Sequence, residues 1–514
     1  MKYNFALALL FMSVYSYAQP GTLDNSFSAD GIATFDFLGG TDSGSDMKIQ
    51  PDGKIVFCGG TGSDESFSNQ DLYVARINAD GLFDNTFGTN GLTRTLRPSY
   101  DQGFALDIQA DGKIVVGGTA SGVGGGYNFY IVRFNTDGSL DLNFGVDGQV
   151  VHEVSVASDE LADITVQADG KIIAIGRTNG GADYDIVVVR FNPDGSIDNT
   201  FSFDGEVITD VAGDDRIEEL YVHDNGKITA LGRVSVGTQQ VLVIRYNADG
   251  TLDNSFGSNG ILLLSLVSGN VYPKGLAVTS AGEMIITAEL SAGNSDVLLA
   301  RLLADGTLDN SFSLDGIVQT DFGERETGYR TLVQPDSRIL VAGYSEDAID
   351  RSMALFRYNW DGTLDNTFGV GGQVVSPLAE YSRFYSVALH EDGKIVACGT
   401  FTGAISSDVC VARYHSGINV GIGDVDAYIG STLIYPNPIT NNSITVEYEL
   451  KADETVSIEL YDLGGKQLSV LQSATEEKAD SYQKTLLLPT LSAGNYLLKL
   501  NTEKGAVSVK LMVN

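Results

Sequence analysis

One short turn recurs seven times along this chain of 514 residues. A clear copy is NADGTLDNSFG at residues 247–257, and each copy carries an aspartate followed three residues later by a phenylalanine. The seven aspartates are spaced by 60, 57, 57, 55, 56 and 56 residues: Asp24, Asp84, Asp141, Asp198, Asp253, Asp309 and Asp365. Such a fixed period indicates a fold that is built from equal parts.

Each unit of this repeat predicts four short strands in a fixed order. The turn leads into a strand such as GIATFDF, and a second strand ends in an Asp-Gly turn such as QPDGKI. Asp-Gly between apolar runs is typical of hairpins, because glycine accepts positive φ. A third strand such as KIVFCGG is apolar on both faces, so we expect it to be buried on both. A loop of variable length and a fourth strand such as DLYVARIN complete the unit.

Four strands in about 57 residues is the size of one propeller blade. One such sheet cannot bury both of its faces, whereas seven sheets around one axis can. We therefore predict an all-β fold, a seven-bladed β-propeller of four-stranded blades over residues 19–415, followed by a small C-terminal β-sandwich. An open β-solenoid is the alternative, but its coils usually repeat at less than half this length. The seven repeats are expected near residues 21–80, 81–137, 138–194, 195–249, 250–305, 306–361 and 362–415.

The fourth strand of every unit carries an arginine, and an arginine in an apolar strand is seldom buried without a partner. In six units the turn aspartate follows this arginine at a distance of eight residues. We expect one ion pair at each blade junction, with the phenylalanine packed beside it: Arg76–Asp84, Arg133–Asp141, Arg190–Asp198, Arg245–Asp253, Arg301–Asp309 and Arg357–Asp365. Arg413 has no downstream turn and Asp24 has no upstream arginine, so a closed ring predicts that these two form the seventh pair.

The same turns overlap a calcium-loop pattern, in which oxygen ligands stand on alternate residues before a glycine. The residues concerned are Asn135, Asp137 and Asp141 in one unit and Asn247, Asp249 and Asp253 in another. However, the strand arginine stands where the first ligand should be, and a fixed cation would compete with Ca²⁺. We therefore interpret these residues as a structural turn and predict neither a metal nor a cofactor, with calcium binding as the alternative.

Catalytic motifs are missing from the sequence, which contains no HExxH, no phosphate loop and no nucleophile elbow. Acidic pairs are so common in this chain that they cannot identify a glycosidase site. We therefore predict no catalytic residue. The loops between the third and fourth strands vary most, for example TGSDESFSNQD from residue 61 and YSEDAIDRS from residue 344. They should emerge on one face of the ring, where they could present a binding site or could vary simply because they are exposed.

The formal net charge is −35, from 67 acidic and 32 basic residues. A field of this sign repels phosphate backbones and anionic lipids, so we expect no nucleic-acid partner. The chain has only three cysteines. Cys398 and Cys410 flank a predicted hairpin loop almost symmetrically, which leaves two alternatives: a cross-strand disulfide, or burial of both as small apolar residues.

The first 18 residues are typical of a secretory signal peptide. They contain a basic start at Lys2, an apolar run over residues 5–14, and small residues at Ser16 and Ala18, so we expect cleavage after Ala18. The run is shorter than the ~20 apolar residues that a membrane span needs, and no later segment is longer. We therefore expect no membrane span after removal of the signal.

The repeat ends after Arg413, and we assign residues 416–431 to a linker and residues 432–514 to a separate β-sandwich of alternating strands. This tail resembles the type A C-terminal sorting domain of the type IX secretion system. The resemblance is carried by Tyr435, Pro436, Asn437, Pro438, Gly464, Gly465, Lys466, Gly494, Tyr496 and Lys510. It implies the type IX secretion machinery as a partner, and a protein that is secreted or held at the outer cell surface of a Gram-negative bacterium.

The repeat region resembles the delta-60 repeat family through its DGxLDxSFG and QxDGKI elements. That family is thought to form propellers and has no established activity, so the resemblance implies the fold and leaves the function open. We favour a non-enzymatic propeller that acts as a binding or adhesion scaffold for a glycan or a surface protein. The alternatives are a secreted hydrolase that acts on polysaccharide at the loop face, and a structural coat component. A cluster of acids in a sugar-sized pocket would favour the enzyme, and a flat, polar loop face would favour binding.

Overall fold

The computed structural model describes residues 19–63, 70–122, 125–181, 183–292, 294–403, 406–418, 429–435, 439, 442–462, 467–492, 494–502 and 505–513. Within these ranges all regular elements are β-strands. Three predicted features lie largely outside the described residues: the signal peptide, most of the linker, and part of the sorting motif, namely Pro436, Asn437, Pro438, Gly464, Gly465 and Lys466.

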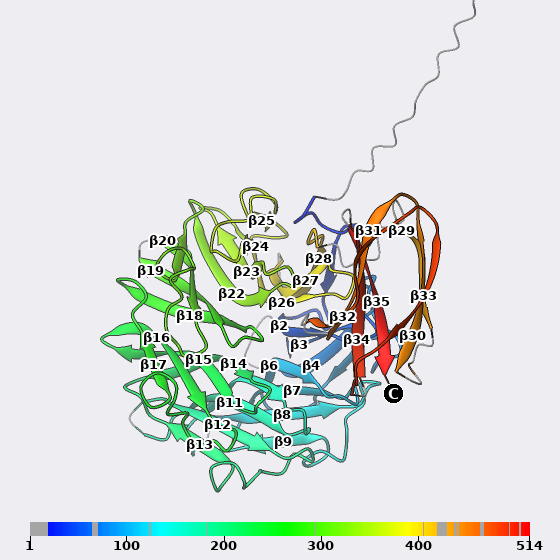
Figure 1. Ribbon diagram of the computed structural model, residues 1–514. Coiled ribbons are helices and arrows are strands. Elements are labelled where there is room, and N and C mark those ends of the chain that lie inside the picture. The colour runs from blue at the N-terminus through cyan, green and yellow to red at the C-terminus, as the bar shows by residue number, and fades with distance from the viewer. Residues whose placement is uncertain are drawn as a thin grey trace, which may run out of the picture.

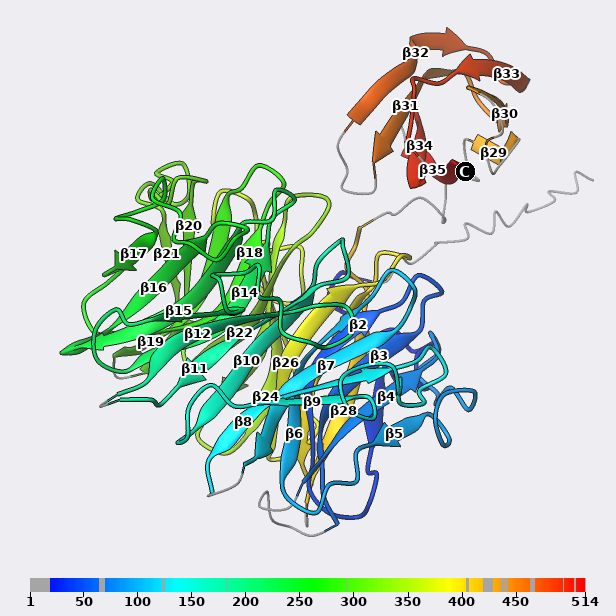
Figure 2. The same cartoon turned by 90° about the horizontal axis from the view of Figure 1, so that it is seen from below.

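The repeat region forms seven four-stranded antiparallel blades around one axis, which Figures 1 and 2 show from two directions. A single parallel pairing of Arg351 with Tyr381 also links the sixth and seventh blades. Neighbouring blades contact one another through their inner strands. The inner strands are β2 (Asp42–Ile49), β6 (Asp101–Ile108), β10 (Asp159–Val166), β14 (Asp215–Val222), β18 (Asn270–Val278), β22 (Arg325–Val333) and β26 (Tyr381–Leu389). The second strands are β3 (Ile55–Thr61), β7 (Ile114–Ser121), β11 (Ile172–Thr178), β15 (Ile228–Val236), β19 (Met284–Ala292), β23 (Ile339–Glu346) and β27 (Ile395–Thr402).

The other two strands of each blade lie toward the rim of the ring. The third strands are β4 (Asp71–Ile77), β8 (Tyr127–Phe134), β12 (Asp185–Phe191), β16 (Thr238–Tyr246), β20 (Asn294–Leu302), β24 (Arg351–Tyr358) and β28 (Ser407–Tyr414). The outer strands are β5 (Leu92–Arg94), β9 (Gln149–His152), β13 (Glu206–Thr209), β17 (Ile261–Leu264), β21 (Ile317–Thr320), β25 (Gln373–Ser376) and β1 (Ile32–Phe35). The predicted all-β propeller of seven four-stranded blades is confirmed, and the solenoid alternative is wrong.

The blades are offset from the sequence repeats by one strand. The second, third and fourth strands of one repeat form the inner, second and third strands of a blade. The first strand of the next repeat forms the outer strand of that blade. The last blade has no following repeat and takes β1, which pairs with β28 from Ile32 opposite Ala412 to Phe35 opposite Val409. Hydrogen bonds between the two ends of the repeat region therefore close the ring.

The core of the propeller is divided into layers between blades. The second strands are almost wholly buried, and all seven residues of β3 are buried, as expected from their apolar sequences. One layer combines Val56 and Val74 of the first blade with Leu106 and Val116 of the second. Each sheet thus buries its two faces against its two neighbours, which a sheet standing alone cannot do.

The third strand of each blade, which is the fourth strand of the sequence repeat, carries an arginine. This arginine lies against the aspartate of the turn that follows the strand. The distances from Nε to Oδ2 are 2.6–2.8 Å in all seven: Arg76–Asp84, Arg133–Asp141, Arg190–Asp198, Arg245–Asp253, Arg301–Asp309, Arg357–Asp365 and Arg413–Asp24. Each guanidinium also stacks on the turn phenylalanine, with Cζ 4.2–4.9 Å from the ring centroid. Six of the arginines further donate to a backbone carbonyl of the next repeat, as Arg76 does to Thr136 at 2.7 Å, and Arg357 donates to that of Ser416. The structure thus brings together all seven pairs, including the one that joins the two ends.

A second cation contacts six of the seven aspartates, and the sequence analysis missed it. It is the basic residue after the Asp-Gly, Asn-Gly or Asp-Ser turn, at 2.7–3.3 Å from the carboxylate: Lys54, Lys113, Lys171, Lys227, Arg338 and Lys394. The fifth repeat has Glu283 at this position. Among the described residues, Arg301 is therefore the sole ion-pair partner of Asp309.

These aspartates should make the protein sensitive to acid. Burial alone would raise their pKa, but hydrogen bonds from the residue two positions later and the adjacent cations outweigh it, so the pKa of all seven lies below the ordinary value of 3.8. A depressed pKa contributes stability above the unfolded value, and this stability is lost as the pH falls through the folded value. We expect the melting temperature, followed by circular dichroism, to fall steadily between pH 4 and pH 2. The melting temperature of Asp198→Asn should fall less over this range. A melting temperature that does not change between pH 4 and pH 2 would contradict the assignment of these carboxylates as ion-pair partners.

The tail contains two sheets that share one core. The first consists of β29 (Ile429–Tyr435), β30 (Ser443–Leu450) and β33 (Ser481–Leu487), and the second of β31 (Glu454–Asp462), β32 (Gln467–Glu477), β34 (Gly494–Thr502) and β35 (Gly505–Val513). Val446 and Tyr448 of the first sheet pack in the same cluster as Ile458 and Leu498 of the second. Of the predicted sorting motif, Tyr435 ends β29, Gly494 and Tyr496 lie in β34, and Lys510 lies in β35.

The three cysteines are free and buried. Cys398 packs in the core layer between the last and first blades, whereas Cys410 packs in the layer between the sixth and seventh. The two side chains therefore lie on opposite faces of the same blade. This excludes the disulfide alternative and leaves both residues as small apolar core residues.

Candidate functional site

Every inner strand contains a β-bulge at the same position. The pairing with the second strand skips one residue in each blade: Ser45, Phe104, Ala162, Glu218, Lys274, Tyr329 and Tyr385. A bulge leaves its extra residue unpaired and can redirect the side chain. All seven of these residues line one pocket on the propeller axis.

This axial pocket has a volume of about 810 Å³, within the range of small-molecule sites. Its lining includes the starts of inner strands, the ends of second strands and the starts of third strands. These strand ends lie side by side, as Asp42 opposite Thr61 and Thr61 opposite Asp71 demonstrate. The pocket therefore opens on the face where the variable loops emerge. We predicted from the sequence that variable loops on this face could present a binding site. The lining of the pocket comes mostly from strand ends rather than from those loops.

An arginine network forms the floor of the pocket. Arg330 of β22 reaches across the axis to the carboxylate of Asp46 at 3.1 Å and to that of Glu219. The acids in turn accept hydrogen bonds from backbone N–H groups of the next blade: Asp46 from Leu106 at 3.1 Å, Asp163 from Leu220 at 2.9 Å and Glu219 from Leu276 at 2.6 Å. This floor ties blades together across and around the axis.

The charges of the floor are strongly coupled. Burial would lower the pKa of Arg330, but Glu219, Asp46 and Asp163 outweigh this effect and raise it, so the guanidinium stays charged. Burial raises the pKa of Glu219 to about 7, although Arg330 opposes this shift. Burial also raises the pKa of Asp163, against the same arginine. Arg330 is therefore the cation that keeps these buried carboxylates together.

The pocket reverses the charge balance of the chain. Six cationic residues line it: Arg177, Arg216, Lys274, Arg330, Arg351 and Arg383. Only three acids do so: Glu160, Asp163 and Glu218. Acids outnumber bases by 67 to 32 over the whole sequence, so this excess of cations is local. Five tyrosines complete the polar wall: Tyr100, Tyr127, Tyr329, Tyr381 and Tyr385.

Most wall charges are already paired. Arg177 lies 2.6 Å from Glu160, Arg216 lies 3.2 Å from Glu218, and Arg351 lies 2.7 Å from Glu346. Of these acids, Glu160 and Glu218 belong to the wall of the pocket. Two wall cations, in contrast, form no ion pair with any residue that the structure describes: Lys274 and Arg383. They are the positions where an incoming anion meets the least competition.

Lys274 and Arg383 flank two tyrosines, and we call the four residues the cation–tyrosine row. Lys274 Nζ lies 5.6 Å from the ring centroid of Tyr329, and Arg383 Cζ lies 5.0 Å from that of Tyr385. The two tyrosine rings are 5.0 Å apart, tilted by 52°. Aromatic faces pack against the apolar side of a sugar ring, while the cations can bind carboxylate or sulfate groups.

The titration of this row suits binding better than proton abstraction. Burial raises the pKa of Tyr329 and of Tyr385, so both phenols stay protonated at neutral pH and can donate hydrogen bonds. Burial also lowers the pKa of Lys274, against the opposing influence of Glu218 and Glu289. A hydrolase would instead need two available carboxyl groups, and the two acids of the wall are both paired with arginine.

The six residues of the calcium alternative lie in turns at the opposite end of the blades. Asp137 accepts hydrogen bonds from the Ser139 backbone at 2.9 Å and hydroxyl at 2.6 Å, and Asp141 binds Arg133 and Lys113. Asp249 and Thr251 repeat the first arrangement. Asp253 binds Arg245 and Lys227, while Asn135 and Asn247 donate back to their own turns. These side chains are thus engaged in holding the turns.

Sequence reasoning missed the residues of the axial pocket. It treated the second strand of each repeat as a uniform element and looked for motifs shared by the units. The bulge position holds a different residue in most blades. Such variation inside an otherwise regular strand is the signal that could have identified the pocket.

Comparison with known proteins adds two matches to families. The family described as "Domain of unknown function (DUF5122) beta-propeller" matches seven segments: residues 50–87, 109–144, 167–201, 223–256, 282–312, 334–368 and 390–417. The family described as "Secretion system C-terminal sorting domain" matches residues 433–514. No curated protein matches the chain.

Several solved structures are similar to the propeller. A catalytically inactive virginiamycin B lyase from Staphylococcus aureus with quinupristin is 12% identical, with a TM-score of 0.44 over 74% of this chain and 98% of that chain. The polysaccharide lyase Uly1 is 11% identical, with a TM-score of 0.45 over 73% and 90%. A protein of unknown function from Dyadobacter fermentans is 13% identical, with a TM-score of 0.41 over 75% and 99%. At these identities the likeness concerns the fold alone.

Proposed function

Because the chain is a seven-repeat β-propeller protein with a secretion system C-terminal sorting domain, we propose that it is a non-enzymatic binding protein whose ligand is an anionic glycan in the axial pocket. The sorting domain indicates handling by the type IX secretion machinery and delivery to the cell surface or the extracellular space. Among the described residues, no helix is long and apolar enough to cross a membrane.

The observation that carries this proposal is the local reversal of charge. Six of the 32 basic residues line a pocket with only three acids. The net charge of −35 repels anions at long range, so an anionic ligand must gain its affinity from contacts inside the pocket. Lys274 and Arg383, which have no ion-pair partner among the described residues, are the groups that we expect to make those contacts.

A glycan fits the pocket better than a small inorganic anion does. The volume of about 810 Å³ has room for several sugar rings, and five tyrosines supply flat apolar faces with hydroxyl groups at their edges. Saccharides that carry carboxylate or sulfate groups combine both requirements. The polysaccharide hydrolase remains the second candidate, and the pairing of Glu160 and Glu218 with arginines argues against it.

Removing the lysine of the cation–tyrosine row should weaken binding. We expect Lys274→Ala to raise the Kd for a polyuronate oligosaccharide by about tenfold or more, as for loss of one charge-assisted hydrogen bond. Isothermal titration calorimetry with the secreted protein would measure this. Arg325→Ala is the matched control, because Arg325 lies on the same strand as Tyr329 and does not line the pocket. Its Kd should not change.

Two further outcomes would contradict the proposal. Equal affinity for a neutral glucan of the same length would show that the cations do not select the ligand. Shortening of the oligosaccharide during incubation, detected as new reducing ends, would move the assignment to an enzyme. A Kd that rises with salt concentration is expected in every case where the charges bind.

A further inference from the structure

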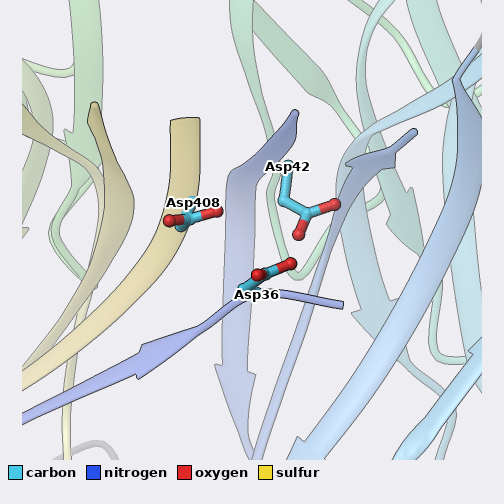
Figure 3. Close-up of side chains that lie close together, drawn as sticks. All are labelled: Asp36, Asp42 and Asp408. Carbon is cyan, nitrogen blue, oxygen red and sulfur yellow. The ribbon is translucent and has the colours of Figure 1, made fainter. Parts of the chain in front are cut away.

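Three of the seven blade junctions bring three carboxylates together on the face of the axial pocket. Each triad takes one acid from the start of a third strand, one from the segment after the outer strand of that blade, and one from the start of the next inner strand. The triads are Asp408, Asp36 and Asp42; Asp185, Asp210 and Asp215; and Asp296, Asp321 and Glu326. Within each triad, one carboxylate oxygen per residue lies within 4.8 Å of the other two. Figure 3 shows the carboxylates of the first triad facing one another.

The innermost acid of each triad is wholly buried: Asp42, Asp215 and Glu326 are 0% exposed. In two of them only one oxygen is satisfied, since Oδ2 of Asp42 accepts from Phe37 N at 2.8 Å and Oδ2 of Asp215 accepts from Val211 N at 2.7 Å. Oδ1 of both residues has no hydrogen-bond partner among the described residues. Both oxygens of Glu326, in contrast, accept hydrogen bonds, from Phe322 N at 3.4 Å and from the Ser345 hydroxyl at 3.5 Å. A buried carboxylate oxygen without a partner is costly.

The junction between the first two blades differs in carrying arginines beside its two acids, although Oδ2 of the buried Asp101 also lacks a hydrogen-bond partner among the described residues. Asp71 and Asp101 stand at the starts of β4 and β6, as Asp408 and Asp42 do at β28 and β2. Here Arg94 lies 3.1 Å from Asp71 and Arg97 lies 3.9 Å from Asp101. No ion pair with lysine, arginine or histidine is formed by any of the nine triad acids within the described ranges. The triads therefore lack the cation that this junction provides.

We propose that the triads of Asp42 and of Asp215 each bind one Ca²⁺ ion. The ligands are all carboxylate oxygens, which a hard cation prefers, and the chain works outside the cell, where sites of modest calcium affinity are filled. Two oxygens that both contact one ion at the 2.3–2.6 Å typical of calcium can be up to about 5 Å apart, against about 4 Å for Mg²⁺. Oxygens within 4.8 Å of one another fit the larger ion.

The three carboxylates of a triad repel one another when all are ionised, because their oxygens lie within 4.8 Å. A divalent ion removes the repulsion among three like charges without the uptake of protons. The ion would also tie the outer strand of one blade to the inner strand of the next, and Asp36 and Asp408 would do this where the ring closes.

Calcium binding is measurable on the purified full-length protein without knowledge of its glycan. Equilibrium dialysis with radioactive calcium should give two ions per chain. The melting temperature should rise by about 5 °C between EDTA and 5 mM CaCl₂, and MgCl₂ should give a smaller shift. Absence of bound calcium at 5 mM would overturn the proposal.

Single substitutions locate the ions. Asp215→Asn should bind one ion per chain, and in EDTA its melting temperature should equal or exceed that of the unchanged protein, because one of three repelling charges is gone. Asp101→Asn is the matched control, since its junction carries arginines, and it should retain two ions. Two ions in Asp215→Asn and in Asp42→Asn alike would place the calcium elsewhere and overturn the assignment.

Discussion

Replacing Arg301 with methionine is expected to lower the free energy of unfolding by about 4–5 kcal/mol, the upper part of the range for breaking a buried ion pair. Arg301 is 2% exposed, and it is the sole ion-pair partner of Asp309 among the described residues. Its guanidinium also lies between two rings, 4.9 Å from the centroid of Phe312 and 4.5 Å from that of Trp360. The substitution leaves a buried carboxylate without a cation and two rings without their packing partner. Urea unfolding followed by circular dichroism would measure the loss.

Arg245→Met is the matched control for this substitution. Asp253 loses Arg245 but keeps Lys227 at 2.7 Å, whereas the fifth repeat has Glu283 in place of that lysine. We expect a loss of about 3 kcal/mol for Arg245→Met, smaller than the loss for Arg301→Met. Equal losses would mean that the lysine contributes nothing, and a loss near zero in both would mean that the arginines do not hold the junctions.

The second large effect concerns the floor of the axial pocket. We expect Arg330→Met to lower the free energy of unfolding by about 3–5 kcal/mol, because it leaves Asp46, Glu219 and Asp163 close together and without their central cation. The loss should be smaller at pH 5 than at pH 8. Without the arginine the pKa of each of these carboxyls rises, and protonation at pH 5 then removes charges that repel one another. Urea unfolding at the two pH values would test this.

The double variant Arg330→Met with Glu219→Gln separates charge from packing. Glutamine has nearly the shape of glutamate and removes one of the three stranded charges, so the double variant should regain part of the stability at pH 8. No recovery, together with a loss that does not depend on pH, would mean that Arg330 acts through its volume alone.

The parts of the fold that could be predicted from the sequence are those with local signals. The turn aspartates, the Asp-Gly hairpins and the arginine eight residues before each turn aspartate lie within one repeat, and together they predict the strands and the number of blades. The tail motif likewise predicts secretion. The offset of the blades could not be found in this way, because which strand completes a sheet is decided by hydrogen bonds between different repeats, such as those of β1 with β28.

The candidate site was predictable only as a face of the ring. The variable loops lie on the face where the pocket opens, but the pocket depends on seven β-bulges, and a bulge is a change of register between two strands that has no fixed sequence signature. The calcium pattern directed attention to turns whose oxygens hold arginines, lysines and backbone amides. The acid triads escaped notice because their members lie far apart in the sequence, as Asp36 and Asp408 do.

The pairing of β1 with β28 has a consequence for the synthesis of the chain. The first strand to be synthesised, β1, can pair only after the last strand of the propeller, β28, has been completed at Tyr414. A chain that stops earlier keeps two unpaired sheet edges, which are prone to join other chains. The sorting domain follows Tyr414 in the sequence. It is therefore synthesised only after the strands that pair the two free sheet edges are complete.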